Sequence, residues 1–259
     1  MKALFIRAYG RLAPDMLVGG LIDMGVPPAF LTAKLTEVGA PTNFIEKANS
    51  HAQISAHYFR IPDGAHDELL LKQDDLLSRW NALCDAGEAE WKTVGWRVLS
   101  TLCAGASTAL DEIDGNIVDL RRGGVREEDV YSLYAFLAGL SYLEIEYIFT
   151  APFELASGDS EAARMTEKIL VRAGSTAGKP VSAEDITPFA AAMLEGLSAD
   201  FTPMDGRFLA DHTAYGTEST TEPDGENTVA LYLGYFTEDR DSVFQKMMKV
   251  FGAGGESIF

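Results

Sequence analysis

The chain of 259 residues contains little cysteine and little histidine. Its two cysteines, Cys84 and Cys103, form no CxxC pair, so a disulfide framework is excluded, and we expect buried thiols in a reduced cytoplasmic setting. The four histidines form no HxxxH or HExxH pattern. The sequence therefore gives no support for a dedicated zinc site.

Basic residues are also scarce. Lys and Arg total 21 against 39 Asp and Glu, which gives a formal net charge of −18. A surface this acidic repels phosphate backbones and anionic lipids, so we expect neither nucleic acid nor a membrane surface as a partner. No apolar run is long enough to predict a signal peptide or a membrane span.

The apolar content of 47% is sufficient for a sizeable core. We predict an α+β fold in which several helices cover a small antiparallel or mixed sheet. Residues 1–155 form an N-terminal α+β region, and residues 156–185 form a linker or mobile loop. Residues 186–259 form a helix and a β-hairpin that pack as one unit with the first region.

Local patterns predict the individual elements. A strand at residues 3–6 is followed by a helix that Asp15 caps, by a second helix beginning at Pro27 and Pro28, and by a hairpin that turns at Asn49 and Ser50. The remaining predictions are long helices at residues 91–113 and 130–140, a strand ending at 152, a short helix at 162–171, a helix starting at 187–188, and strands at 208–215 and 228–236.

Familiar catalytic motifs are missing from the sequence. There is no GxSxG nucleophile elbow, and the string "AGSTAGKP" has only three residues between Gly174 and Gly178, so it does not form a phosphate-binding loop. The adjacent pair Glu127 and Glu128 points in directions about 100° apart on a helix. We interpret this pair as a solvated helix edge.

Two segments, "RAYGRLAPDMLVGGLIDMGVP" and "DITPFAAAMLEGLSADFTPMDG", resemble the LarC family. The resemblance implies the fold of the N-terminal part of that family. It also implies insertion of nickel into a pyridinium-derived nucleotide by a CTP-dependent cyclometallase. Nickel and CTP are expected only if that activity is retained.

The resemblance assigns candidate site residues one by one. Asp15 and Glu128 match carboxylates and would be the catalytic residues, whereas Arg11, Arg121, Arg122 and Thr187 would bind an anionic ligand. The family carries a His/Glu-rich element where this chain reads "VDLRRGGVREEDV", which contains no histidine. The metal ligands are therefore unknown.

The family's loop before the first helix also differs here. Its leading aspartate is replaced by Arg7, and its two glycines are replaced by Arg11 and Pro14. Glycines at such a position let the backbone approach an anion closely, and this freedom is lost here.

Three hypotheses follow from the sequence. The chain is a divergent nickel-inserting protein that works with a partner chain carrying the family's C-terminal domain. Alternatively, it is a non-catalytic binding or scaffold subunit for an anionic ligand or a partner chain. In the third, the resemblance reflects shared packing alone and the cleft binds something unrelated.

Overall fold

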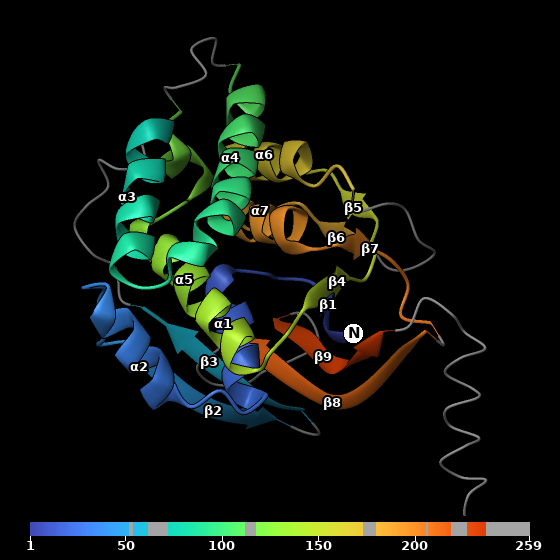
Figure 1. The fold of residues 1–259 in the computed structure, drawn as a ribbon. Coiled ribbons are helices and arrows are strands. Elements are labelled where there is room, and N and C mark those ends of the chain that lie inside the picture. The colour runs from blue at the N-terminus through green and yellow to red at the C-terminus, as the bar shows by residue number, and fades with distance from the viewer. Residues whose placement is uncertain are drawn as a thin grey trace, which may run out of the picture.

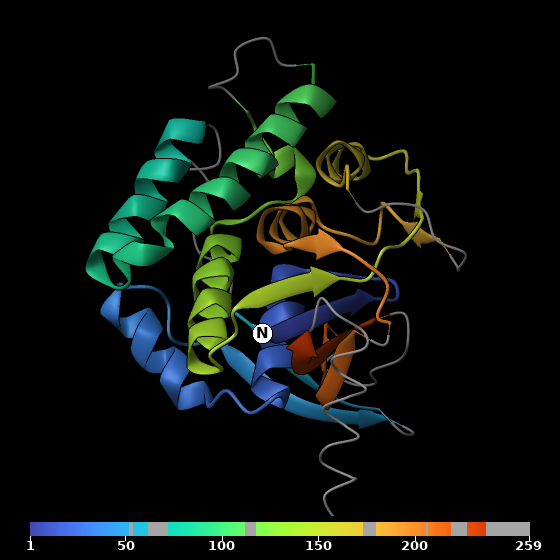
Figure 2. The same cartoon turned by 45° about the vertical axis from the view of Figure 1, so that its right-hand side comes forward.

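The computed structural model describes residues 1–51, 54–61, 72–111, 118–172, 180–205, 207–218 and 227–236. Within these ranges a seven-stranded mixed sheet has the order β2-β3-β8-β9-β1-β4-β7. Figures 1 and 2 show the helices gathered on one side of this sheet. The predicted α+β class with a mixed sheet covered by helices is confirmed.

The predicted helices and strands occur in the structure, which also contains four elements that were not predicted: a helix at Gln73–Ala86 and short strands at Leu155–Ala156, Val181–Ser182 and Asp200–Phe201. The strands are β1 (Lys2–Ala8), β2 (Ile45–His51), β3 (Ile54–Arg60), β4 (Tyr147–Thr150), β5 (Leu155–Ala156), β6 (Val181–Ser182), β7 (Asp200–Phe201), β8 (Phe208–Thr217) and β9 (Thr228–Phe236). The helices are α1 (Pro14–Asp23), α2 (Pro28–Glu37), α3 (Gln73–Ala86), α4 (Lys92–Ala109), α5 (Glu127–Tyr142), α6 (Glu161–Ile169) and α7 (Pro188–Leu197), with the short 3₁₀ helices η2 (Ala89–Trp91) and η3 (Leu120–Gly123).

Strand β1 lies inside the sheet and is buried on both faces. It pairs antiparallel with β9 and parallel with β4. Leu4 and Ile6 belong to the main core, whereas Phe5 belongs to a second cluster with Phe149 and Phe236. This arrangement explains why β1 reads as a continuous apolar run rather than an alternating one.

Helix α1 touches the sheet backbone to backbone. A Cβ atom added to Gly216 of β8 would lie 1.8 Å from the carbonyl oxygen of Met16, and one added to Gly19 would lie 2.3 Å from that of His57 in β3. No side chain fits between these elements. The glycines therefore set the distance between α1 and the sheet.

Two local predictions were wrong. Helix α1 begins at Pro14 with Ala13 as its N-cap, so Asp15 lies inside the first turn instead of capping it. Proline fits this first position because its missing N–H would have no partner in the helix. Asn49 and Ser50 do not form the hairpin turn, because they pair with residues of β3 inside the β2–β3 ladder.

The segment predicted as a linker, residues 156–185, contains ordered elements. Helix α6 packs against α4 and α7, and β6 pairs with β5. Residues 173–179 of the "AGSTAGKP" string and residues 237–259 lie outside the described residues. The division into regions stays a prediction.

Cys84 and Cys103 are both free and buried, as predicted. Burial raises the pKa of the Cys84 thiol to about 11 and that of the Cys103 thiol to about 12. Among the described helices, none combines the length and apolar character that crossing a membrane requires.

His57 of β3 and Asp23 of α1 together connect the helix to three strands. The His57 Nδ1 atom lies 3.1 Å from Asp23 Oδ1, and its Nε2 atom lies 3.1 Å from Glu46 Oε1. Asp23 also accepts a hydrogen bond of 2.8 Å from the Tyr215 backbone N–H. The hydrogen bond to Asp23 raises the pKa of His57, and the charge of Glu46 adds to this rise.

We predict that Gly216→Ala destabilises the protein by about 3 kcal/mol, because its Cβ would collide with backbone that cannot rotate away. Chemical denaturation measures this change. Gly124→Ala is the matched control: it meets open space at a φ of 71° and should cost about 1–2 kcal/mol. Equal losses in the two variants would contradict the close-packing argument.

We predict that His57 makes stability fall as the pH rises. The folded state binds the His57 proton more tightly than the unfolded state does, so the stabilisation is complete below the unfolded pKa of about 6.5 and disappears above the folded pKa. The His57→Gln variant should lack this decline in denaturation midpoint above pH 6.5. The variant His212→Gln, at an exposed position in β8, should retain it.

Candidate functional site

The N-terminal ends of α1, α5 and α7 lie close together in the structure. The Thr187 N–H donates to the Leu12 carbonyl oxygen at 3.0 Å, which joins the start of α7 to the residues just before α1. A Cβ added to Gly123 would lie 3.1 Å from Pro188 Cγ, so η3, the short helix just before α5, packs against the start of α7. Helix N-termini carry unpaired N–H groups and a partial positive charge, which favour anions.

The first turn of α5 carries three consecutive acidic residues, and all of them are buried. Glu127, Glu128 and Asp129 are each only 5% exposed. Glu127 accepts a hydrogen bond of 2.8 Å from the Tyr131 hydroxyl group and lies 3.5 Å from Arg79 Nε. Burying carboxylates is unfavourable unless they are paired, and the helix N-terminus reduces that cost.

Asp129 forms a capping box at the start of α5. It accepts a 2.8 Å hydrogen bond from the Arg126 N–H, and the Arg126 guanidinium lies 3.7 Å from the same carboxylate. Burial nevertheless raises the pKa of Asp129 to about 7, and the charges of Asp15 and Glu128 act in the same direction. The Asp129 carboxyl group therefore holds its proton to a higher pH than an exposed aspartate does.

Asp15 joins this group from the first turn of α1. Its carboxylate accepts a hydrogen bond of 3.0 Å from the Met16 N–H. Burial raises the pKa of Asp15, while the positive charges of Arg126 and Arg60 lower it. The charge of Asp15 thus acts on the ionisation of Asp129 across the α1–α5 contact, although the two residues are far apart in sequence.

Each of the three arginines predicted to bind an anion forms an ion pair with a carboxylate of the protein itself. Arg11 pairs with Glu218, and Arg122 pairs with Glu161 at the start of α6. Arg121 makes two contacts to Asp119, at 2.8 and 3.0 Å.

Thr187 caps α7, where its hydroxyl oxygen accepts from the Ala190 N–H at 3.2 Å. The structure therefore places Asp15, Glu128 and Thr187 at converging helix starts. The side chains of Arg11, Arg121 and Arg122 are exposed to solvent.

Sequence reasoning missed part of this site. The interpretation of Glu127 and Glu128 as a solvated edge was wrong, because packing against neighbouring elements covers both side chains. Asp129, Arg126 and Arg60 were not predicted as site residues. A usable signal was present in the acidic run at a helix start, which suits the helix dipole.

Within the described ranges, no group of three or more His, Cys, Asp or Glu side chains is arranged to hold a metal ion. The first turns of α1 and α5 carry the carboxylates of Asp15, Glu127, Glu128 and Asp129, which offer oxygen ligands only. Oxygen ligands bind nickel less readily than imidazole nitrogens do.

The fold and the site define an α+β protein that brings buried carboxylates to converging helix starts. Comparison with known families then identifies the chain: it belongs to the nickel insertion protein family, whose sequence profile matches residues 8–251. The resemblance to the LarC family is confirmed.

Two curated relatives are similar over most of the chain. A Geotalea daltonii protein named for nickel insertion is 26% identical over 94% of this chain and 64% of its own length. The pyridinium-3,5-bisthiocarboxylic acid mononucleotide nickel insertion protein of Thermotoga sp. is 24% identical over 91% of this chain and 62% of its own length. The chain thus spans a little under two thirds of each relative. No solved structure matches it significantly.

We predict that one carboxyl group of the native protein titrates near pH 7 and that Asp129→Asn removes this titration. Carboxyl ¹³C NMR across pH 3–9 measures it directly. Because the folded state holds this proton more tightly, wild-type stability should fall between pH 4 and 7 relative to the variant. Asp119→Asn is the control, since an arginine lowers the pKa of Asp119. Persistence of the pH 7 titration in Asp129→Asn would contradict the assignment.

Proposed function

We propose that this chain takes part in inserting nickel into pyridinium-3,5-bisthiocarboxylic acid mononucleotide, the reaction that the name of the Thermotoga relative describes. The family match over residues 8–251 carries the proposal. The position of the matching motifs supports it. The motif containing Asp15 starts α1, and the motif containing Thr187 starts α7, so both lie where helix N-termini converge.

The chemistry of the reaction gives the buried carboxylates a role. A cyclometallation joins the metal to a ring carbon and releases the proton that the carbon held, so it needs a base. A base works best when its pKa lies near the operating pH. Asp129, with a pKa raised to about 7, meets this requirement, and Asp15 adjusts it through its charge. Glu128 would supply a carboxylate oxygen to the entering nickel ion.

The converging helix starts also suit the anionic groups of the substrate. The partial positive charges of α1 and α7 attract a phosphate or carboxylate group. Arg11, Arg121 and Arg122 would exchange their protein carboxylates for those of the substrate. Breaking these ion pairs would cost little stability, because ion pairs exposed to solvent contribute only about 0–1 kcal/mol each.

We further propose that CTP and a separate partner chain are needed for the complete reaction. The support for this requirement is the membership of the nickel insertion protein family. The second candidate function is a binding or scaffold subunit that holds the anionic nucleotide or the partner chain without performing the insertion. The pairing of Arg11, Arg121 and Arg122 with carboxylates is compatible with either role.

The test mixes the purified protein with nickel, the bisthiocarboxylic acid mononucleotide and CTP, with and without the remaining region of the Thermotoga relative. Mass spectrometry detects the nickel-containing product. We expect Asp15→Asn and Asp129→Asn to reduce the initial rate about 100-fold or more, the range for loss of general acid–base catalysis. Glu154→Gln, at an exposed position outside the site, should change it less than about twofold.

A nickel titration by calorimetry, with and without CTP, separates the two functions. Saturable nickel binding that Asp15→Ala or Glu128→Gln weakens would support direct participation of these carboxylates. Tight binding of the nucleotide without product, under all conditions, would overturn the insertion role and leave the binding subunit as the function.

A further inference from the structure

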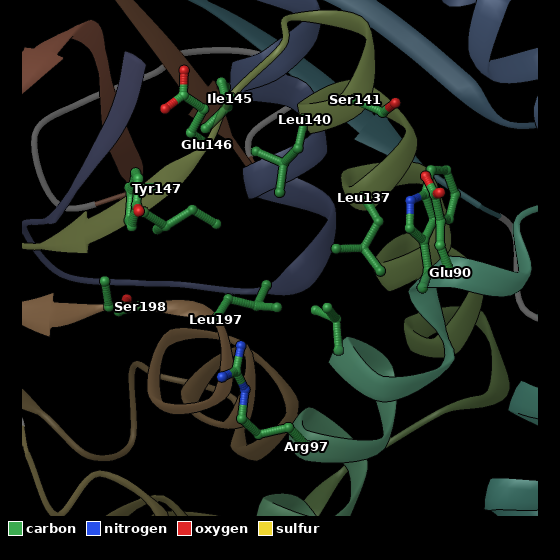
Figure 3. Close-up of a pocket in the computed structure, with 14 residues that line it drawn as sticks. Glu90, Arg97, Leu137, Leu140, Ser141, Ile145, Glu146, Tyr147, Leu197 and Ser198 are labelled. Carbon is green, nitrogen blue, oxygen red and sulfur yellow. The ribbon is translucent and has the colours of Figure 1, made fainter. Parts of the chain in front are cut away.

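A cavity of about 510 Å³ opens at the opposite end of α5 from the carboxylate site. The cavity is bordered by the C-terminal ends of α5 and α7 and by the start of β4. On the other side it is bordered by η2 and the first half of α4. Its volume lies within the range of small-molecule sites, about 300–1,000 Å³. Figure 3 shows the side chains that line it.

The cavity combines an apolar floor with a charged rim. Trp91, Leu137, Leu140 and Leu197 are buried side chains that form much of the floor. Arg97 reaches from α4 toward Leu197, and Glu90 and Glu146 stand at the rim (Figure 3). An apolar surface with a few polar groups at its edge is the usual composition of a ligand site.

Arg97 differs from every other arginine in the described part of the chain. Each of the others has a hydrogen bond, an ion pair or an aromatic ring contact. No such contact joins the Arg97 guanidinium to another described residue. The Arg97 side chain is exposed, and it is the only basic residue among the described residues that line the cavity.

We propose that this cavity binds a small organic monoanion whose apolar body covers the floor and whose carboxylate pairs with Arg97. A guanidinium recognises a carboxylate through two parallel N–H···O bonds. The rim carboxylates Glu90 and Glu146 repel a second negative charge, so a dianion or a nucleotide triphosphate fits poorly. The site is therefore distinct from the proposed nickel and nucleotide site and does not rest on it.

The probe is 2-naphthoate, titrated into the full chain by calorimetry, with uncharged 2-naphthylmethanol and dianionic naphthalene-2,6-dicarboxylate as comparisons. A ligand of this size should bind with a dissociation constant on the order of 1 mM or tighter. Each comparison compound should bind about tenfold more weakly than 2-naphthoate. The double variant Glu90→Gln/Glu146→Gln should strengthen binding of the dianion.

Arg97→Gln should weaken 2-naphthoate binding about tenfold. Arg164→Gln, an equal change of charge on the exposed surface of α6, should alter it less than about twofold. Val94→Trp, which fills the cavity from α4, should abolish binding while the circular dichroism spectrum stays unchanged. If that variant does not fold, the comparison of Arg97→Gln with Arg164→Gln still decides the question.

Three results would overturn the proposal: no saturable binding up to about 10 mM, equal losses in Arg97→Gln and Arg164→Gln, or full affinity in Arg97→Gln. Asp15→Asn should bind 2-naphthoate as the wild type does. The outcome is therefore independent of whether nickel insertion is found.

Discussion

The backbone contact between α1 and the sheet determines where the functional groups lie. With Gly19 in the helix and Gly216 in β8, carbonyl oxygens approach positions that any side chain would occupy. This contact places the first turn of α1 under the N-terminus of α5, which brings Asp15 into electrostatic contact with Asp129. A helix held further out would separate the two carboxyl groups and leave Asp15 in water, with no reason for a raised pKa.

Burial and charge oppose each other at the carboxylate site. Desolvation favours the protonated form of each acid, while the Arg126 guanidinium and the N–H groups at the start of α5 favour the ionised form. For Asp129 desolvation is the larger effect, even though this carboxylate accepts a hydrogen bond from the Arg126 N–H. The raised pKa brings the titration of Asp129 closer to neutral pH than that of an exposed aspartate, which is almost fully ionised there.

The sequence predicted the fold better than the site, for a physical reason. Thr187–Pro188 and Pro27–Pro28 are local signals for a helix start, and alternation in 228–236 is a local signal for a strand; the structure contains all three elements. The turn at Asn49 and Ser50 failed because strand pairing overrode a weak turn preference. The burial of Glu127 and Glu128 depends on elements remote in sequence, which no local pattern reveals. The family resemblance predicted Asp15 and Thr187 as site residues. The ion pair between Arg11 and Glu218 joins residues about 200 apart in sequence, so no local pattern could predict it.

Helix α5 connects two chemically different environments. Its first turn lies among buried acids and converging helix N-termini, while Leu137 and Leu140 near its other end line a largely apolar cavity together with Arg97. Since the helix is buried along almost its whole length, neither end can shift without disturbing the core that both share. A ligand in the cavity would restrict the same helix that carries Asp129. Binding at one end can therefore alter proton affinity at the other only by changing the packing of α5, because the charge itself is screened over this length.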